Sequence, residues 1–158
     1  MELTIQLGDT HEGRWLQLHV AQRSDIGDRA ENQDAVGHRL FGDWLVCTLA
    51  DGAGGHRGGQ LAAALAVEHL LGTFEQSPTL DSLQLLEMIQ QVNRHILCFQ
   101  ASHPEYSDMH TTICMLVINR KSAKAIWLHV GDSRVYHFQQ ATLRSRTKDH
   151  SVLQWMID

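Results

Sequence analysis

The stretch LADGAGGHRGGQLAAALAVEHLL, residues Leu49–Leu71, places one carboxylate between an apolar run and a helix-forming segment. Asp51 ends the apolar run, and five glycines follow it between Gly52 and Gly59. Glycine lets the main chain approach a ligand closely, so such a turn can present a carboxylate and a backbone carbonyl together. Hard divalent cations prefer oxygen ligands of this kind. A structural connector and a phosphate loop stay open as alternatives, although the GxxxxGKS/T spacing of a nucleotide loop is missing.

Size and charge exclude several classes of protein. A chain of 158 residues with 43% hydrophobic content can bury a core as a single domain, 1–158. The formal charge of -5 arises from scattered residues rather than blocks, which argues against a nucleic-acid-binding stripe or a basic membrane patch. No stretch approaches the roughly 20 apolar residues of a membrane span. We therefore expect a cytoplasmic protein that binds neither nucleic acid nor membranes.

The three cysteines, Cys47, Cys98 and Cys114, are odd in number and widely spaced. Cys47 and Cys114 lie in apolar runs. We interpret them as reduced core residues rather than as metal ligands or redox groups.

The first half of the chain predicts strands followed by two helices. Alternating or apolar segments predict strands at 15–23, 35–41 and 43–51, the last two joined by a turn at Gly42 and Asp43. Helical spacing predicts one helix from Gln60 to Leu71 and a longer one that is capped by Asp81 or Ser82 and ends before Pro104. Its expected apolar stripe is Leu83, Leu86, Ile89, Ile96 and Leu97.

The second half predicts an antiparallel meander. Four segments rich in β-branched, aromatic and aliphatic residues are separated by polar or glycine turns, at 111–120, 123–132, 133–139 and 141–147. A third helical pattern begins near 149 and runs to the last residue.

Two further segments carry candidate site residues. Arg29 offers a planar fork of donors suited to a phosphate, and Asp34 can lie beside Asp51 if their strands are neighbours. Taken alone, this segment is better explained as a polar turn with a surface ion pair. Asp132 follows Gly131 at a predicted strand end, where a tight hairpin turn is the alternative to a chemical role.

Five segments in order, RAENQD, ADGAGGH, MHTT, VGDSRVY and TKDHS, together resemble the PPM family of metal-dependent Ser/Thr protein phosphatases, also called type 2C. The resemblance runs from about Ser24 to the last residue. It implies an α+β fold, a four-layer αββα sandwich of two antiparallel β-sheets flanked by helices, of which this chain is the N-terminal portion. It also implies two Mn²⁺ or Mg²⁺ ions at one end of the sheets, with a third in bacterial-type members.

The resemblance assigns roles to five positions. It implies that Asp51 bridges two metals, that the Gly52 carbonyl ligates one of them, and that Asp34 supports the site through metal-bound water. It further implies that Arg29 holds the substrate phosphate and that Asp132 helps to bind a third metal. The implied reaction is hydrolysis of phosphoserine and phosphothreonine by a water between two cations about 3.5–4 Å apart, with phosphorylated proteins as partners.

Several positions depart from the family pattern. Gln33 stands where many eukaryotic members have a glutamate, which indicates a bacterial-type sequence, and Ala53 replaces a histidine thought to act as general acid. His110 replaces the usual glycine of the GTT segment, and His56 is more typical of a surface or capping group than of a substitute acid.

The later "DG" and "DN" segments of the family are missing, so we expect too few carboxylates for tight metal binding. A catalytically inactive binding module, a truncated fragment and a small-molecule phosphohydrolase therefore stay open as alternatives.

Overall fold

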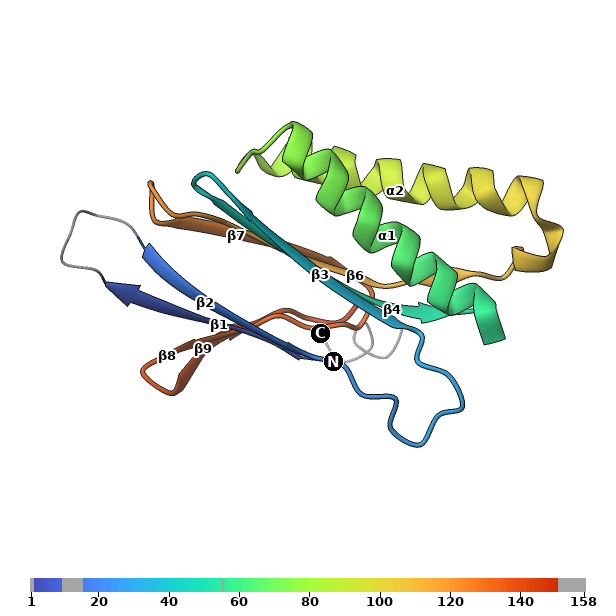
Figure 1. Cartoon of the computed structure of the whole chain (residues 1–158), viewed down its shortest axis with the longest axis horizontal. Helices are drawn as coiled ribbons and strands as arrows, with labels where there is room; N and C mark the ends of the chain where they lie inside the picture. Colours follow the sequence, from blue (N-terminus) through green and yellow to red (C-terminus); the bar gives the residue numbers. More distant parts are fainter. Residues whose placement is uncertain (1, 10–15, 55, 151–158) are drawn as a thin grey trace.

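The computed structural model describes residues 2–9, 16–54 and 56–150, and Figure 1 shows their arrangement. The strands are β1 (Glu2–Asp9), β2 (Leu16–Arg23), β3 (Asp34–Phe41), β4 (Trp44–Ala53), β5 (His110–Thr111), β6 (Ile113–Asn119), β7 (Lys124–Val130), β8 (Tyr136–Gln139) and β9 (Thr142–Arg146). The helices are α1 (His56–Gln76), α2 (Ser82–Ser102) and the short 3-10 helix η1 (Pro104–Tyr106). Almost all of the third predicted helical pattern lies outside the described residues.

Strand β4 occupies the centre of an antiparallel sheet with the order β3-β4-β6-β7, and β5 pairs with its C-terminal end. Its side chains alternate between two apolar clusters: Val46 and Ala50 belong to one, Leu45 and Cys47 to the other. A strand that is covered on both faces has no need of polar residues on alternate positions. This explains the continuous apolar run WLVCTLA that precedes Asp51.

Both long helices lie on the same face of this sheet (Figure 1). Strand β3 approaches α1 closely at Gly37, where an added Cβ would lie 2.7 Å from Leu71 Cδ1. Near the same end of α1, the ring of Phe74 meets the rings of Phe41 and Trp44 edge-on, with centroids 6.1 and 5.8 Å apart. The aromatic contacts therefore fix the C-terminal half of α1 on the β3–β4 hairpin.

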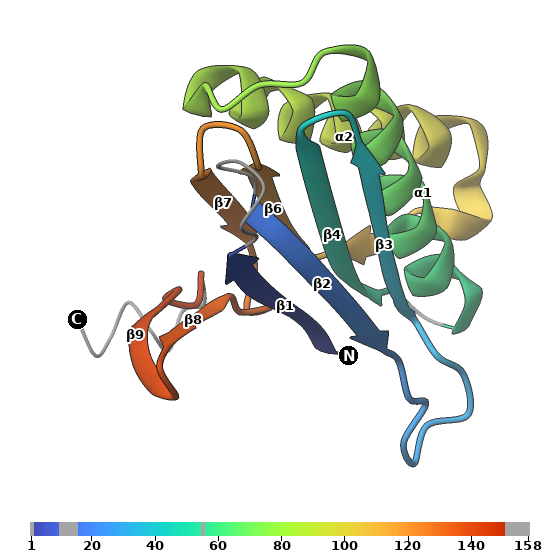
Figure 2. The same ribbon diagram turned by 60° about the vertical axis from the view of Figure 1, so that its left-hand side comes forward.

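The β1–β2 hairpin lies on the opposite face of the sheet (Figure 2). Leu16, Leu18 and Val20 of β2 pack on the apolar cluster that contains Leu45 and Cys47. The Arg120 guanidinium donates a hydrogen bond of 2.9 Å to the Leu16 carbonyl and ties the hairpin to the sheet. Helices, central sheet and hairpin thus form three successive layers.

These layers confirm the predicted α+β fold, and the fourth layer of the predicted sandwich stays a prediction. The predicted strands at 15–23, 35–41 and 43–51 are confirmed within one or two residues by β2, β3 and β4. Strand β1 was not predicted. Neither long helix of the described ranges is long and apolar enough to cross a membrane.

The predicted four-stranded meander is wrong. Strands β6 and β7 pair as expected, but β8 and β9 form a separate hairpin that does not continue the sheet. The chain turns away at Gly131, whose φ of 100° is a conformation that other residues resist. The four segments were correctly predicted as strands because that prediction needs only local composition, whereas their pairing depends on this turn.

The predicted apolar stripe of α2 is also partly wrong. Three of its leucines are exposed, and the buried row is formed instead by Leu85, Met88, Ile89, Val92 and Ile96. The segment SLQLLEMI carries leucine on two sides of the helix, so apolar spacing alone does not select the face that packs on α1. For the same reason Cys98, predicted to be in the core, is exposed, whereas Cys47 and Cys114 are buried as predicted.

Asp81 caps α2, as one of the two predicted candidates. Its carboxylate accepts hydrogen bonds from the backbone N–H groups of Leu83 at 3.0 Å and Gln84 at 2.9 Å. We expect Asp81→Ala to lower the free energy of unfolding by about 1 kcal/mol, because both amides lose this partner. Asp81→Asn keeps an oxygen acceptor and serves as the control. Urea unfolding measures both, and an equal loss in the two variants would contradict the capping role.

Candidate functional site

Asp34 and Asp51 face each other across the β3–β4 pair, which confirms the expectation that their strands are neighbours. Asp34 opens β3, and its N–H donates a hydrogen bond of 3.0 Å to the Asn32 side chain. Asn32 in turn donates to the Ser24 hydroxyl at 2.8 Å. Strand register and this short network therefore place two carboxylates at one end of the sheet.

The main chain of Asp51 is held by two consecutive threonines. Its N–H donates to Thr112 Oγ1 at 3.0 Å, and its carbonyl accepts from the Thr112 N–H at 2.9 Å and from Thr111 Oγ1 at 3.0 Å. The residue itself is exposed. The backbone is thus fixed at three points at the exposed end of β4.

The glycines that follow Asp51 allow a backbone-to-backbone contact. A Cβ on Gly52 would lie 1.9 Å from the Gly59 carbonyl oxygen, and a Cβ on Gly59 would lie 2.7 Å from the Gln33 side-chain oxygen. The Gly52 N–H also donates to the Gln33 carbonyl at 3.1 Å. The first turn of α1 can approach the end of β4 only because side chains are missing at both glycines. The glycine-rich segment after Asp51 is therefore a closely packed connection between β4 and α1.

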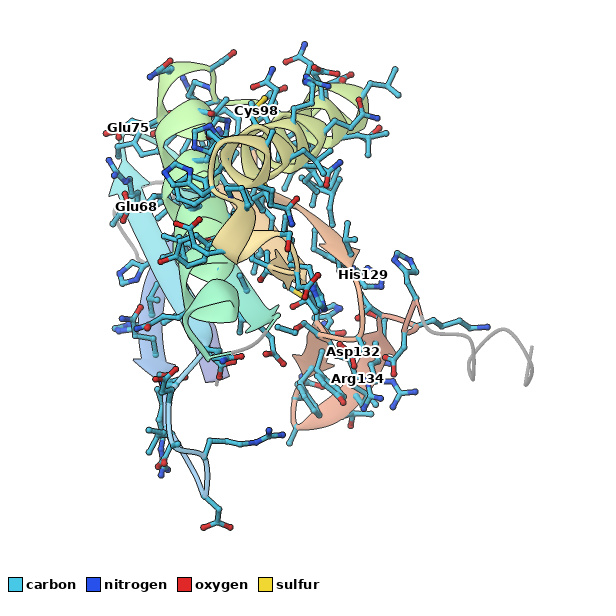
Figure 3. The ribbon with its side chains drawn as sticks, turned by 90° about the vertical axis from the view of Figure 1, so that its right-hand side faces the viewer. Glu68, Glu75, Cys98, His129, Asp132 and Arg134 are labelled. Atoms are coloured by element: carbon cyan, nitrogen blue, oxygen red, sulfur yellow. The ribbon has the colours of Figure 1, made fainter. Side chains whose placement is uncertain are left out.

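Asp132 lies on the turn between β7 and the β8–β9 hairpin, close to Arg134 (Figure 3). The turn is braced by the segment that follows β9. Arg134 donates two hydrogen bonds to the Asp149 carboxylate, at 2.7 and 2.6 Å, and the His150 N–H donates to the Gly131 carbonyl at 2.9 Å. The forked ion pair lowers the pKa of Asp149. Sequence reasoning did not assign a role to Arg134 or Asp149.

The three predicted carboxylates act on one another electrostatically. Although Asp51 is exposed as a residue, partial loss of solvent around its carboxyl group raises its pKa above the ordinary value, and the neighbouring charges of Asp34 and Asp132 raise it further. Acids that repel one another in this way fit a divalent cation, which would relieve the repulsion and accept their oxygens. Among the described residues, however, no group of three His, Cys, Asp or Glu side chains is arranged to hold a metal ion. The donors fit the cation in kind, but the set is incomplete.

Arg29 is not brought into this group. It lies in the exposed loop before β3, and its N–H donates to the Ile26 carbonyl at 3.3 Å. Among the described residues, the hydrogen bonds at Asp51 come from Thr111 and Thr112 and not from Arg29. Its predicted role as a phosphate ligand therefore stays a prediction.

The positions that depart from the family pattern lie at the edges of the site. Ala53 pairs with His110 across β4 and β5. The His110 ring is exposed, and its Nδ1 contacts the Asp108 carbonyl at 2.8 Å, so it turns toward its own loop. His56 is the first residue of α1.

Fold and site together define an α+β protein with several carboxylates at one end of a central antiparallel sheet. Residues 21–152 match the family described as Protein phosphatase 2C. The chain belongs to this family.

Individual relatives agree with the family match. The serine/threonine phosphatase Stp of Listeria welshimeri is 31% identical over an alignment of 147 positions that covers 89% of this chain and 58% of the relative. The serine/threonine protein phosphatase PstP of Mycobacterium tuberculosis is 32% identical over an alignment of 147 positions that covers 90% of this chain and 27% of the relative. The chain thus spans little more than half the length of the Listeria relative.

Solved structures show the same relation. The Streptococcus agalactiae serine/threonine phosphatase superposes with a TM-score of 0.69 at 26% identity, covering 98% of this chain and 57% of that structure. The catalytic domain of PstP in complex with two manganese ions gives a TM-score of 0.65 at 25% identity, covering 99% of this chain and 59% of that structure.

We expect Gly52→Ala to lower the free energy of unfolding by about 3 kcal/mol or more, because its Cβ meets backbone atoms that have no rotamer to change. Gly72→Ala is the matched control, because Gly72 lies in α1 with open space around it. This substitution should raise the free energy of unfolding by about 0.5–1 kcal/mol. Urea unfolding of both variants measures the difference. If Gly52→Ala were as stable as the unmodified chain, the close contact with Gly59 would be refuted.

Proposed function

We propose that the chain forms part of the catalytic domain of a metal-dependent protein serine/threonine phosphatase that hydrolyses phosphoserine and phosphothreonine. The observation that supports this most directly is the position of three aspartates within the range that matches the family: Asp34 pairs with Asp51 across β3 and β4, and Thr112 contacts both Asp51 and the turn that carries Asp132. Phosphorylated proteins would be its partners, and the fold of the whole domain would be the predicted four-layer αββα sandwich. A cytoplasmic location belongs to the same proposal.

In this proposal the carboxylates of Asp34, Asp51 and Asp132 and the Gly52 carbonyl hold Mn²⁺ or Mg²⁺, two ions or three. The manganese complex of the PstP catalytic domain supports the choice of metal. When bound, such ions neutralise phosphate charge and make water a stronger nucleophile. The contribution of this chain is geometric: the pairing of β3 with β4 and the threonine contacts hold the carboxylates at one end of the sheet before any ion arrives.

Arg29 would bind the phosphate of the substrate. A guanidinium donates two parallel hydrogen bonds to phosphate oxygens, which orients the group as well as attracting it. Its exposed loop leads directly into β3, which begins at Asp34, five residues later. A bound phosphate would therefore lie on the same side of the sheet end as the carboxylates.

A second candidate function is phosphoprotein binding without turnover. It is favoured by the incomplete ligand set of the described residues. Isothermal titration with Mn²⁺ separates the two candidates. Binding that depends on Asp51 supports the metal-dependent enzyme, whereas phosphopeptide binding that does not respond to Mn²⁺ supports the binding module.

We expect Asp51→Asn to weaken Mn²⁺ binding by about 100-fold or more, since loss of groups that merely orient metal ligands already costs 10–100-fold. Mn²⁺-dependent hydrolysis of a phosphothreonine peptide should fall in parallel. Asp43→Asn, on the turn at the other end of β4, is the control that changes the same charge away from the site. Equal Mn²⁺ affinity in the two variants would show that Asp51 is not a ligand.

We expect Arg29→Ala to weaken the interaction with a phosphothreonine peptide by about 10–100-fold, the usual effect of losing hydrogen bonds to a charged group. Arg23→Ala removes an exposed arginine that pairs with Asp25 and serves as the control. Peptide affinity and kcat/KM are the measurements. The assignment fails if the unphosphorylated peptide loses as much affinity as the phosphorylated one.

A further inference from the structure

Thr112 contacts two segments of the site, the end of β4 that carries Asp51 and the turn that carries Asp132. Its Oγ1 accepts the Asp51 N–H at 3.0 Å and lies 2.6 Å from Ser133 Oγ. Its methyl group lies against Gly131, where an added Cβ would be only 2.7 Å from Thr112 Cγ2. Gly131 and Ser133 flank Asp132, so one threonine touches the residues on either side of that carboxylate.

The burial pattern of the turn agrees with this arrangement. Gly131 and Ser133 are half-buried, whereas Asp132 between them is exposed. Thr112 therefore contacts the two less exposed residues of this turn, and Asp132 between them is the more exposed one.

We propose that Thr112 and Ser133 are positioning residues that join the Asp51 end of β4 to the Asp132 turn and so set the distance between the two carboxylates. The inference rests on the proposed function, because it gives the distance a purpose in binding a divalent cation. Neither hydroxyl acts as a ligand or touches the substrate in this assignment. Each acts through the backbone beside a carboxylate.

The contact between the two hydroxyls is needed because the carboxylates repel one another. Each additional negative charge favours a turn conformation in which Asp132 lies farther away. A hydroxyl-to-hydroxyl contact of 2.6 Å and a backbone N–H bond to the same oxygen resist this displacement with directional contacts. A site that is held together before the ion binds does not have to be rearranged by the ion.

The variants Thr112→Val and Ser133→Ala test the proposal, and Thr112→Ser tests whether the hydroxyl alone restores the function. Thr112→Val keeps the shape of the side chain but removes the oxygen that both neighbours use. Thr48→Val is the matched control, because Thr48 lies on β4 and its buried hydroxyl has no hydrogen-bond partner among the described residues. Replacement of that hydroxyl should leave the site unchanged.

The first measurement is the Mn²⁺ affinity by isothermal titration. We expect Thr112→Val and Ser133→Ala each to weaken binding about tenfold, as is usual for groups that orient metal ligands. The double variant should resemble Thr112→Val alone, because the two residues act through one contact. Thr112→Ser and Thr48→Val should bind as the unmodified chain does. Unchanged affinity in both test variants, or losses that multiply in the double variant, would overturn the proposal.

The second measurement needs no metal. Amide hydrogen exchange of the metal-free chain, followed by NMR, should show the Asp51 amide exchanging about tenfold faster in Thr112→Val but not in Thr48→Val. If the unmodified chain does not bind Mn²⁺, the metal part of the proposed function fails for this chain, and the exchange data still decide the positioning role. Unchanged exchange at Asp51 in Thr112→Val would refute it.

Discussion

Strand β4 is the constraint on which the described structure depends, because it is paired along both edges and covered on both faces. Strands β3 and β6 pair with its edges, α1 covers one face and the β1–β2 hairpin covers the other. Such a strand cannot shift by one residue without exchanging its two apolar sets. Asp51 lies near the end of this strand, so the position of the candidate ligand is set by the core rather than by a loop.

This packing changes the interpretation of the glycines around the site. A glycine-dense turn suggests mobility when read in the sequence, yet Gly52 and Gly59 bring two backbones into contact, and a Cβ on Gly54 would lie only 2.1 Å from the Asp108 carbonyl oxygen. The absence of side chains here produces tight packing rather than freedom. The α1 side of the site is therefore held by close backbone contacts, whereas the Asp132 turn is held by hydroxyl contacts and the Arg134–Asp149 ion pair.

The sequence was sufficient to predict the features that depend on local pattern. It predicted the strands that flank Asp34 and Asp51, the cap at Asp81 and the neighbouring positions of the two aspartates. It failed where three-dimensional context selects between equivalent local patterns, as at the leucines on two sides of α2. It also overlooked Thr112 and Ser133, because a hydroxyl that bridges two turns leaves no spacing signature. Only the repeated threonine of MHTT hinted at a role, and the hydrogen bonds were needed to define it.

The positions of the three aspartates along the chain suggest the order in which folding brings them together. Asp34 and Asp51 are brought together by adjacent strands of one hairpin, which needs only local pairing. Asp132 joins them from a segment about eighty residues later, and its approach opposes the repulsion among three carboxylates. Favourable contacts that do not involve the carboxylates must offset this cost in the metal-free chain. Thr112, bonded to the Asp51 backbone and wedged between Gly131 and Ser133, is placed where those contacts are required. The frame of the site can therefore be stable in this chain even though the ligand set held by its described residues is incomplete.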